Sequence, residues 1–198
     1  EELNTFLNEN DITIRANYEY IESVLDIPSI IDYYCAEIYF NNKDWPTNNN
    51  KLWNNGRLGK WRQMFYDIDG GWQYLGVSYN QLNRALSATG TGQNAPYATF
   101  LFRKLVESPI FLDQFLHRMA CLMKTTFDAE NVVEIINLMK GFCIDGVEEH
   151  IDRWLRPTSY TAWSSGVNGL ISFANARRDH VIAHIENQFD IEFDIYEY

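Results

Sequence analysis

Three oxygen-bearing side chains in the first third of the chain have the order and spacing of a phosphoryl-transfer site. Asp44 and Asn49 stand five positions apart, like the catalytic-loop Asp and Asn in the H-R-D-x-x-x-x-N motif of protein kinases. An apolar run then leads to Asp67, where such an enzyme needs a second carboxylate for Mg²⁺. Asp44 is therefore a candidate catalytic acid, Asn49 and Asp67 are candidate metal ligands, and Asp69 is either a further ligand or a turn residue.

A purely structural interpretation of the same residues remains open. Asp44 can cap a turn ahead of Pro46, the neighbouring asparagines can brace a loop, and Asp67 can end a strand. Each residue taken alone favours this interpretation. Their combined order and spacing, together with the surrounding aromatic residues, favour a kinase-type site.

Basic and aromatic residues fill the segment between the two halves of this pattern. The side chains of Arg57, Lys60 and Arg62 are suited either to contact phosphate or acidic substrate groups, or to form the solvated face of a hairpin. The tryptophans are more typical of core packing than of stacking on a sugar; they are Trp45, Trp53, Trp61 and Trp72.

The elements that would position these residues are mostly helices. Apolar residues at three- and four-residue steps predict a helix over 26–41, begun by Asp26 and ending at Asn41 and Asn42. The asparagine-rich stretch 41–55 predicts a loop, residues 60–68 a short strand or hairpin, and residues 72–96 an irregular segment.

Further helices are expected over 98–107, 108–124, 128–155 with a possible bend, and 159–189 with a possible break at Gly166 or Gly169. Within the third of these, Val132, Val133, Ile135, Ile136 and Met139 are expected to face inward. The alternating tail 190–198 is typical of an edge strand. The prediction is a single domain over 1–198 with a mainly α fold and a small β-hairpin (α+β).

Composition excludes several function classes. A net charge of −11 argues against a nucleic-acid partner or an anionic membrane surface, and a nucleotide site here would need metal ions or a local basic patch. No apolar run approaches the roughly 18 residues of a transmembrane segment. The sequence has no G-x-S-x-G, G-x-G-x-x-G or Walker A motif, which excludes hydrolase, Rossmann and P-loop sites.

Cysteine and histidine spacing adds no metal or redox motif. The odd set Cys35, Cys121 and Cys143 favours buried free thiols over a disulfide framework, although one pair could bridge in an oxidising compartment. His180 and His184 have the i, i+4 spacing of zinc ligands but lack the Glu of H-E-x-x-H and an evident third ligand, so we expect a surface or half-buried pair.

Several local motifs together resemble one family. They are Asn42-Lys43-Asp44-Trp45-Pro46 with Asn48-Asn49, Trp61-Arg62 before Phe65-Tyr66-Asp67-Ile68-Asp69, Glu148-Glu149-His150 before Arg153-Trp154, and Trp163 before Phe173-Ala174 and Arg177. This set, spread over about residues 18–189, is similar to the spore coat protein H (CotH) family of atypical secreted kinases with a protein-kinase-like fold.

The resemblance implies the C-lobe of such a kinase, with Asp44 as the catalytic-loop acid and Asn49 and Asp67 holding the metal. Asn42-Lys43 replaces the His-Arg of ordinary kinases, and Ile68-Asp69 replaces Phe-Gly, as in the CotH pattern. Arg177 is a candidate for an ion pair between the last helix and the loop region.

The same resemblance implies an N-lobe that this sequence does not show. No Gly-rich loop and no strand with a phosphate-binding lysine precede Asp44. The chain starts without an initiator Met or a signal sequence, and so has the appearance of a piece of a longer protein. Alone, it is expected to bind nucleotide poorly and to be inactive.

The expected function is transfer of the γ-phosphate of ATP to Ser or Thr of a protein substrate, with Mg²⁺ or Mn²⁺ as cofactor. The family implies a secreted or cell-surface setting. The alternative is a non-catalytic scaffold at the cell surface that keeps a kinase-like shape and binds a protein or glycan.

Overall fold

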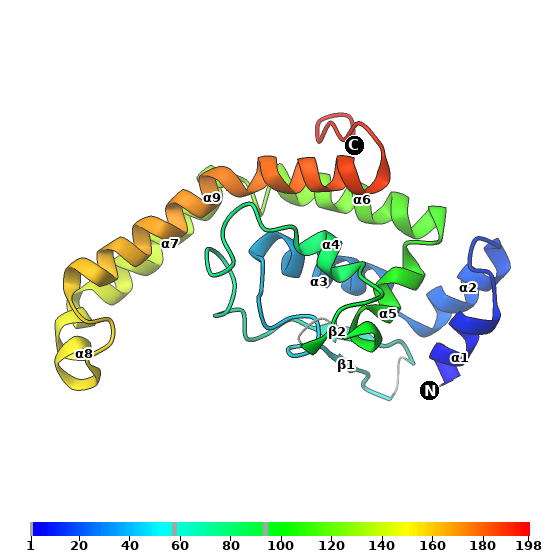
Figure 1. Cartoon of the computed structure of the whole chain (residues 1–198), viewed down its shortest axis with the longest axis horizontal. Coiled ribbons are helices and arrows are strands. Elements are labelled where there is room, and N and C mark those ends of the chain that lie inside the picture. Colours follow the sequence, from blue (N-terminus) through cyan, green and yellow to red (C-terminus); the bar gives the residue numbers. More distant parts are fainter. Residues whose placement is uncertain (1, 57–58, 93–94) are drawn as a thin grey trace.

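Helices dominate the computed structural model, which describes residues 2–56, 59–92 and 95–198 (Figure 1). The helices are α1 (Glu2–Glu9), α2 (Arg15–Val24), α3 (Ile27–Phe40), α4 (Gln81–Ala85), α5 (Pro96–Leu105), α6 (Pro109–Met123), α7 (Ala129–Cys143), α8 (Val147–Trp154) and α9 (Tyr160–Phe189). Strands β1 (Lys51–Trp53) and β2 (Arg62–Met64) pair antiparallel, with Lys51 opposite Met64. The predicted mainly α fold with a small hairpin is confirmed.

Helix α3 forms the centre of the molecule and leads directly into the candidate site. The Asp26 side chain caps its first turn by accepting a hydrogen bond from the Ser29 N–H at 3.3 Å. Asn41 ends the helix in the left-handed conformation, with φ of 62°, which asparagine tolerates better than most residues. The prediction of a helix over 26–41 is thus confirmed at both ends.

The hydrophobic core surrounds α3 and is rich in stacked aromatic rings. Tyr34 stacks on Phe102 of α5 at 4.2 Å between ring centroids, and Tyr39 stacks on Phe127 at 4.4 Å. Helices α4, α6 and α9 and strand β2 pack on α3. Burial of each such side chain stabilises the fold by about 1.5–3 kcal/mol, so the loop that follows α3 starts from a rigid base.

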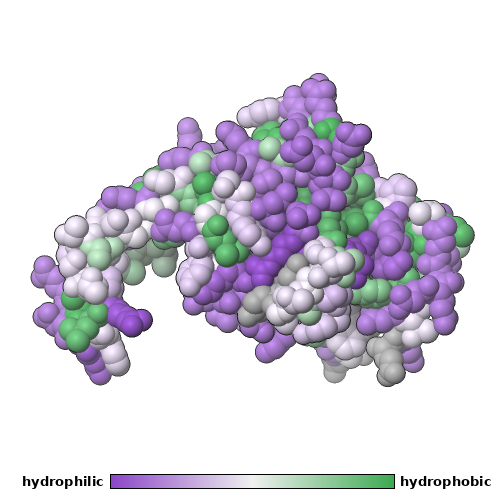
Figure 2. Space-filling view, viewed as in Figure 1, coloured by the Kyte–Doolittle hydropathy of each residue, from purple (hydrophilic) through white to green (hydrophobic). Residues whose placement is uncertain are grey.

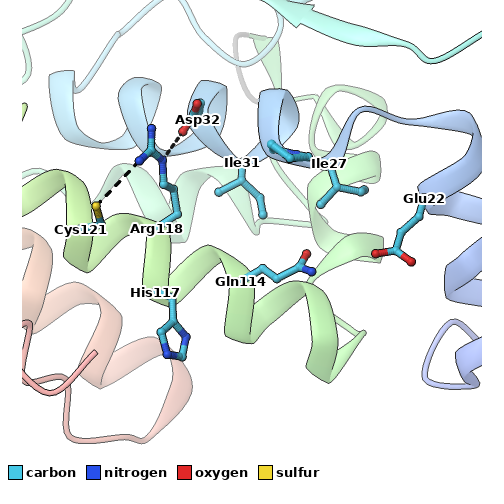
Figure 3. A pocket seen from close by; sticks show the side chains of 9 residues that line it. Glu22, Ile27, Ile31, Asp32, Gln114, His117, Arg118 and Cys121 are labelled. Carbon is cyan, nitrogen blue, oxygen red and sulfur yellow. Dashed lines mark hydrogen bonds and ion pairs between the residues drawn. The ribbon is translucent and has the colours of Figure 1, made fainter. Parts of the chain in front are cut away.

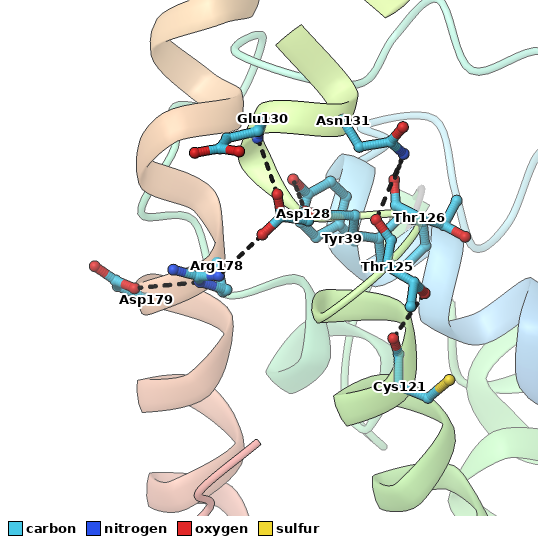
Figure 4. A network of polar contacts seen from close by, with 10 residues as sticks. Tyr39, Cys121, Thr125, Thr126, Asp128, Glu130, Asn131, Arg178 and Asp179 are labelled. Carbon is cyan, nitrogen blue, oxygen red and sulfur yellow. Dashed lines mark hydrogen bonds and ion pairs between the residues drawn. The ribbon is translucent and has the colours of Figure 1, made fainter. Parts of the chain in front are cut away.

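Helices α7 and α8 and the first half of α9 form a helical arm that stands clear of the body (Figures 1 and 2). A polar network joins the base of the arm to α9 (Figure 4). Asp128 caps α7 by accepting from the Glu130 N–H, and its other oxygen lies 3.4 Å from a guanidinium nitrogen of Arg178. The Asn131 amide donates to the carbonyl oxygen of Thr126, which fixes the turn between α6 and α7.

The structure corrects several expectations about individual elements. No helix was predicted before Asp26, because this part of the sequence is mixed and rich in asparagine. The structure has α1 and α2 there, and α1 buries Leu7. Helix α9 runs unbroken through Gly166 and Gly169. The tail is not a strand: Phe193 and Ile195 instead turn into the core.

Exposure of the arm differs from the prediction as well. Ile135 and Met139 were expected to face inward, but about half of each side chain is exposed, at 50% and 55%.

Among the cysteines only Cys35 is buried, whereas Cys121 and Cys143 are exposed free thiols. None of the helices in the described part of the chain has the length and apolarity that a membrane span requires.

Candidate active site

The loop that follows α3 is held in place by asparagine side chains. The Asn41 amide donates to the carbonyl oxygen of Gly76 at 2.9 Å. Asn50 donates to the carbonyl oxygen of Pro46 at 3.1 Å and accepts from the Gln63 amide of β2 at 3.2 Å. These bonds replace regular secondary structure, as expected for an asparagine-rich loop.

Asn42 is the residue that joins the two halves of the motif. It is fully buried, and its side-chain oxygen accepts from the Asp44 N–H at 3.2 Å. Its amide nitrogen lies 3.4 Å from the carbonyl oxygen of Asp67, and its own carbonyl accepts from the Gln81 side chain at 2.6 Å. The sequence prediction missed this role, although an asparagine directly after a helix-ending asparagine was a usable signal.

Asp44 lies against the backbone of the turn that follows Asp67. A Cβ atom at Gly70 would lie only 2.8 Å from an Asp44 carboxylate oxygen and 3.1 Å from Lys43 Cγ. The Lys43 N–H donates to the Gly70 carbonyl oxygen at 3.0 Å, which holds the two segments together. A side chain at this position would therefore displace the Asp44 carboxylate or the turn from the arrangement seen here.

Asn49 and Asp67 meet directly. The Asn49 side-chain amide donates to the carbonyl oxygen of Asp67 at 2.8 Å, and the Tyr33 hydroxyl donates to the Asn49 carbonyl oxygen at the same distance. Both Asn49 and Asp67 have positive φ, 56° and 59°, a conformation that Asn and Asp adopt more readily than other non-glycine residues. The structure thus brings together two predicted site residues that are 18 positions apart in the sequence.

Asp67 and Asp69 both have exposed side chains, and Asp69 directly precedes Gly70. Asp44 and Asn49 are partly exposed. The described residues include no group of three or more His, Cys, Asp or Glu side chains placed to hold a metal ion by themselves. Mg²⁺ fits this site in another way, because it takes one or two carboxylates and completes its shell with water and phosphate oxygens.

Two cations near Asp44 were not singled out from the sequence. The Lys43 ammonium lies 3.5 Å from the centre of the Tyr74 ring, and its pKa is raised by a hydrogen bond to Tyr74 and, less strongly, by Asp44 and Asp69. Burial lowers the pKa of Arg84, and Tyr79 and Asp44 oppose that shift. Two cations therefore lie among the carboxylates of the site.

Of the basic residues that the sequence suggested as candidate phosphate contacts, Lys60 and Arg62 line a different groove from the site. Arg62 forms an ion pair with Asp26 at 2.7 Å, and with Lys60, Trp53 and Asp26 it lines a small groove beside β1 and β2. Arg57 lies outside the described residues. Since Arg62 already has a carboxylate partner, Lys43 and Arg84 are better placed as cations of this site.

The tryptophans divide between core and surface. Trp45, next to Asp44, is fully buried and packs edge-on against Tyr34 at 5.8 Å, as predicted. Trp53 and Trp61 are exposed at 40% and 42%. Core packing thus explains the tryptophan of the Asp-Trp-Pro motif but not the two on the hairpin side.

Arg177 connects the last helix to the site, as the sequence predicted, but through different partners. Its buried guanidinium donates to the carbonyl oxygens of Ile38 and Tyr39 at the end of α3, and of Val77 and Tyr79 before α4. An ion pair was expected. Five fixed N–H donors suit a cluster of carbonyls equally well, because one guanidinium can donate to several acceptors at once.

The histidine pair is not part of a group of three or more His, Cys, Asp or Glu that could hold a metal ion within the described residues. The rings of His180 and His184 are 6.5 Å apart, and burial, Arg177 and His180 lower the pKa of His184 to about 4. A separate groove of about 650 Å³ lies between α2, α3 and α6 and contains Arg118, bonded to Asp32 at 2.6 Å (Figure 3). Its lining residues include none of the predicted site residues.

Comparison with known proteins identifies the family. A family model described as CotH kinase protein matches residues 1–181. Neither the curated proteins nor the solved structures contain a match to the chain. Because the family model covers most of the sequence, including every residue of the site described above, the chain belongs to the CotH kinase protein family.

Proposed function

We propose that this chain carries the catalytic loop and metal-binding segment of a protein kinase that transfers the γ-phosphate of ATP to Ser or Thr of a protein. The observation that carries the proposal is the contact between Asn49 and Asp67 beside the Asp44 carboxylate. Family membership supports it, since the matching model is described as a kinase.

Asp44 would orient the acceptor hydroxyl and accept its proton as the transfer proceeds. In that step the hydroxyl oxygen bonds to the γ-phosphorus, the bond from phosphorus to the β–γ bridging oxygen breaks, and ADP leaves. Such a positioned base contributes roughly 10²–10⁴-fold to a rate. The hydrogen bond from the Asp44 N–H to the Asn42 side-chain oxygen would keep the Asp44 carboxylate at a fixed place.

Asn49 and Asp67 are the residues that would hold Mg²⁺ or Mn²⁺, with Asp69 at the edge of the same turn. A bound divalent ion would offset the charge that develops on the phosphate oxygens. The Asn49 amide nitrogen is engaged by the Asp67 carbonyl, which leaves the side-chain oxygen of Asn49 to face a cation. Lys43 and Arg84 would add positive charge for the transferred phosphate.

The direct test uses the intact protein with labelled ATP and Mg²⁺ or Mn²⁺. We expect label in protein acceptors, a loss of at least about a hundredfold in Asp67→Ala, and native labelling in Asp152→Ala. Asp152 is a matched control because it is exposed on α8 in the arm. Equal labelling by the native protein and Asp67→Ala would contradict the assignment of Asp67. A folded native protein that transfers no label would favour the binding-module alternative.

A further inference from the structure

A fully buried glutamate lies directly beneath the candidate site. Glu37 of α3 is 0% exposed, and no hydrogen bond of standard geometry reaches either of its carboxylate oxygens within the described residues. Burial raises its pKa to about 8, and the Asn42 side chain, acting as a hydrogen-bond donor, opposes that shift. A buried acid without full hydrogen bonding is costly to the fold, so its position calls for an explanation.

The neighbour of Glu37, Asn42, explains the position of this acid, because Asn42 also joins the two halves of the motif. Its side chain contacts the Asp44 N–H, the Asp67 carbonyl oxygen and, on the core side, the Glu37 carboxyl. Its backbone carbonyl is fixed by Gln81 of α4. Glu37 therefore adds a contact on the core side to the bonds that the Asn42 side chain makes within the site.

We infer that Glu37 is a positioning residue for phosphate transfer: from the core it fixes the Asn42 side chain, and Asn42 in turn fixes the spacing between Asp44 and Asp67. The inference rests on the proposed function. Groups of this kind, one step removed from the reacting atoms, typically change metal affinity or activity by about 10–100-fold when replaced.

The environment of Glu37 favours a neutral carboxylic acid at pH 7. Tyr33, one turn earlier on α3, is the titratable group on which its charge acts. The cations that reach α3 from neighbouring helices are engaged elsewhere: Arg118 of α6 with Asp32, and Arg177 of α9 with backbone carbonyls. A neutral acid has one donor and one acceptor, which match the acceptor and donor of a primary amide.

The neutral state also gives a sign for pH dependence. Since the folded-state pKa of about 8 exceeds the ordinary value of 4.5, the folded protein binds more protons than the unfolded chain between these values. The contribution of Glu37 to stability is therefore complete below pH 4.5 and is lost as pH rises toward 8. Ionisation above that pH would also place a buried negative charge beside the Asn42 side chain.

The test compares Glu37→Gln, an isostere of the neutral acid, with Glu37→Leu in the intact protein. At pH 7 we expect Glu37→Gln to keep native kcat and Glu37→Leu to lose about tenfold or more in kcat with little change in the KM for ATP. On the alkaline side, native activity should fall above about pH 8 and Glu37→Gln should not. Glu134→Gln makes the same chemical change at an exposed position of α7 and should behave as native.

Two results would overturn the inference: native kcat in folded Glu37→Leu, or an unchanged alkaline limb in Glu37→Gln. The second still decides if Glu37→Leu does not fold. If the native protein shows no transfer activity, the proposed function is contradicted but this inference is not. The affinity for Mn²⁺ then replaces kcat as the quantity measured. That affinity should weaken about tenfold in Glu37→Leu. If Glu37→Leu does not fold, it should weaken in the native protein, but not in Glu37→Gln, when the pH is raised past 8; an unaltered affinity overturns the inference.

Discussion

The site and the helical arm reverse the usual distribution of polar and apolar residues in opposite ways. Around the site, polar side chains are buried at or near 0% exposure; they are Glu37, Asn41, Asn42, Gln81 and Arg177. On the arm, large apolar side chains are exposed; they are Ile135, Leu138, Met139, Phe142, Trp154 and Leu155. The first arrangement costs desolvation and the second leaves apolar surface in water, so each departs from what folding alone favours.

The difference shows that side-chain positions are fixed by hydrogen bonds in the site and not on the apolar face of the arm. In the site, Asn41, Gln81 and Arg177 hold segments that are far apart in the sequence, as the bond from Arg177 to Ile38 shows. On the arm, Ile135, Leu138, Met139 and Phe142 form one stripe at i, i+3, i+4 and i+7, and an apolar groove of about 420 Å³ extends from Phe40 and Trp72 along α7 and α9. Changes in the site should therefore cost far more than changes on the arm.

The largest expected effect is the loss of the Arg177 guanidinium. Arg177→Met removes a donor from four carbonyl oxygens, two at the end of α3 and two before α4, of which that of Tyr79 keeps a backbone donor, the Gln81 N–H; we expect the free energy of unfolding to fall by about 3–5 kcal/mol. Chemical denaturation measures it. Arg153→Met on α8, where the arginine is exposed, should change stability by less than about 0.5 kcal/mol. Similar losses from both variants would remove the contrast between the two regions.

Two glycine substitutions, one in the site and one on the arm, give the next test. Gly70→Ala places a Cβ 2.8 Å from an Asp44 oxygen, so the carboxylate or the turn must move, and we expect kcat to fall by about 10–100-fold. Gly141→Ala on the arm meets no atom within 4 Å and should raise stability by about 0.5–1 kcal/mol. If Gly70→Ala kept full kcat, the close approach of Asp44 to this turn would be irrelevant to transfer.

The smallest expected effect belongs to the exposed face of the arm. Phe142 is 75% exposed, and Phe142→Ser should change the free energy of unfolding by less than about 0.5 kcal/mol. Phe102→Ala, at a ring that stacks on Tyr34 in the core, should cost about 3–5 kcal/mol. A loss above about 2 kcal/mol in Phe142→Ser would show that this face is covered within the molecule, against the exposure described above.

Local signals in the sequence predicted the parts of the fold that depend on local physics. The cap at Asp26 and the left-handed Asn41 bound α3 as expected, since capping is decided within a few residues. The order of Asp44, Asn49 and Asp67 likewise predicted their proximity, because the motif and the hairpin together fix the chain path.

Long-range contacts were beyond prediction from the sequence. Asn42 meets Gln81 across 39 positions, and no local pattern marks that pair. The periodicity of α7 predicted an inward face correctly for Val132 and Ile136 but could not show that the helix leaves the body, which exposes Ile135 and Met139. Arg177 was expected to tie the last helix to the loops, and only the nature of its partners differs.

The central claim is that Asp67 holds a metal ion while Asp44 acts on the acceptor hydroxyl, and one measurement separates these roles. Mn²⁺ binding in the presence of ATP, followed by paramagnetic resonance in the intact protein, is compared with phosphate transfer for Asp67→Ala and Asp44→Ala. We predict that Asp67→Ala loses both, whereas Asp44→Ala binds Mn²⁺ as the native protein does and loses only transfer. Native Mn²⁺ affinity in Asp67→Ala would contradict the account.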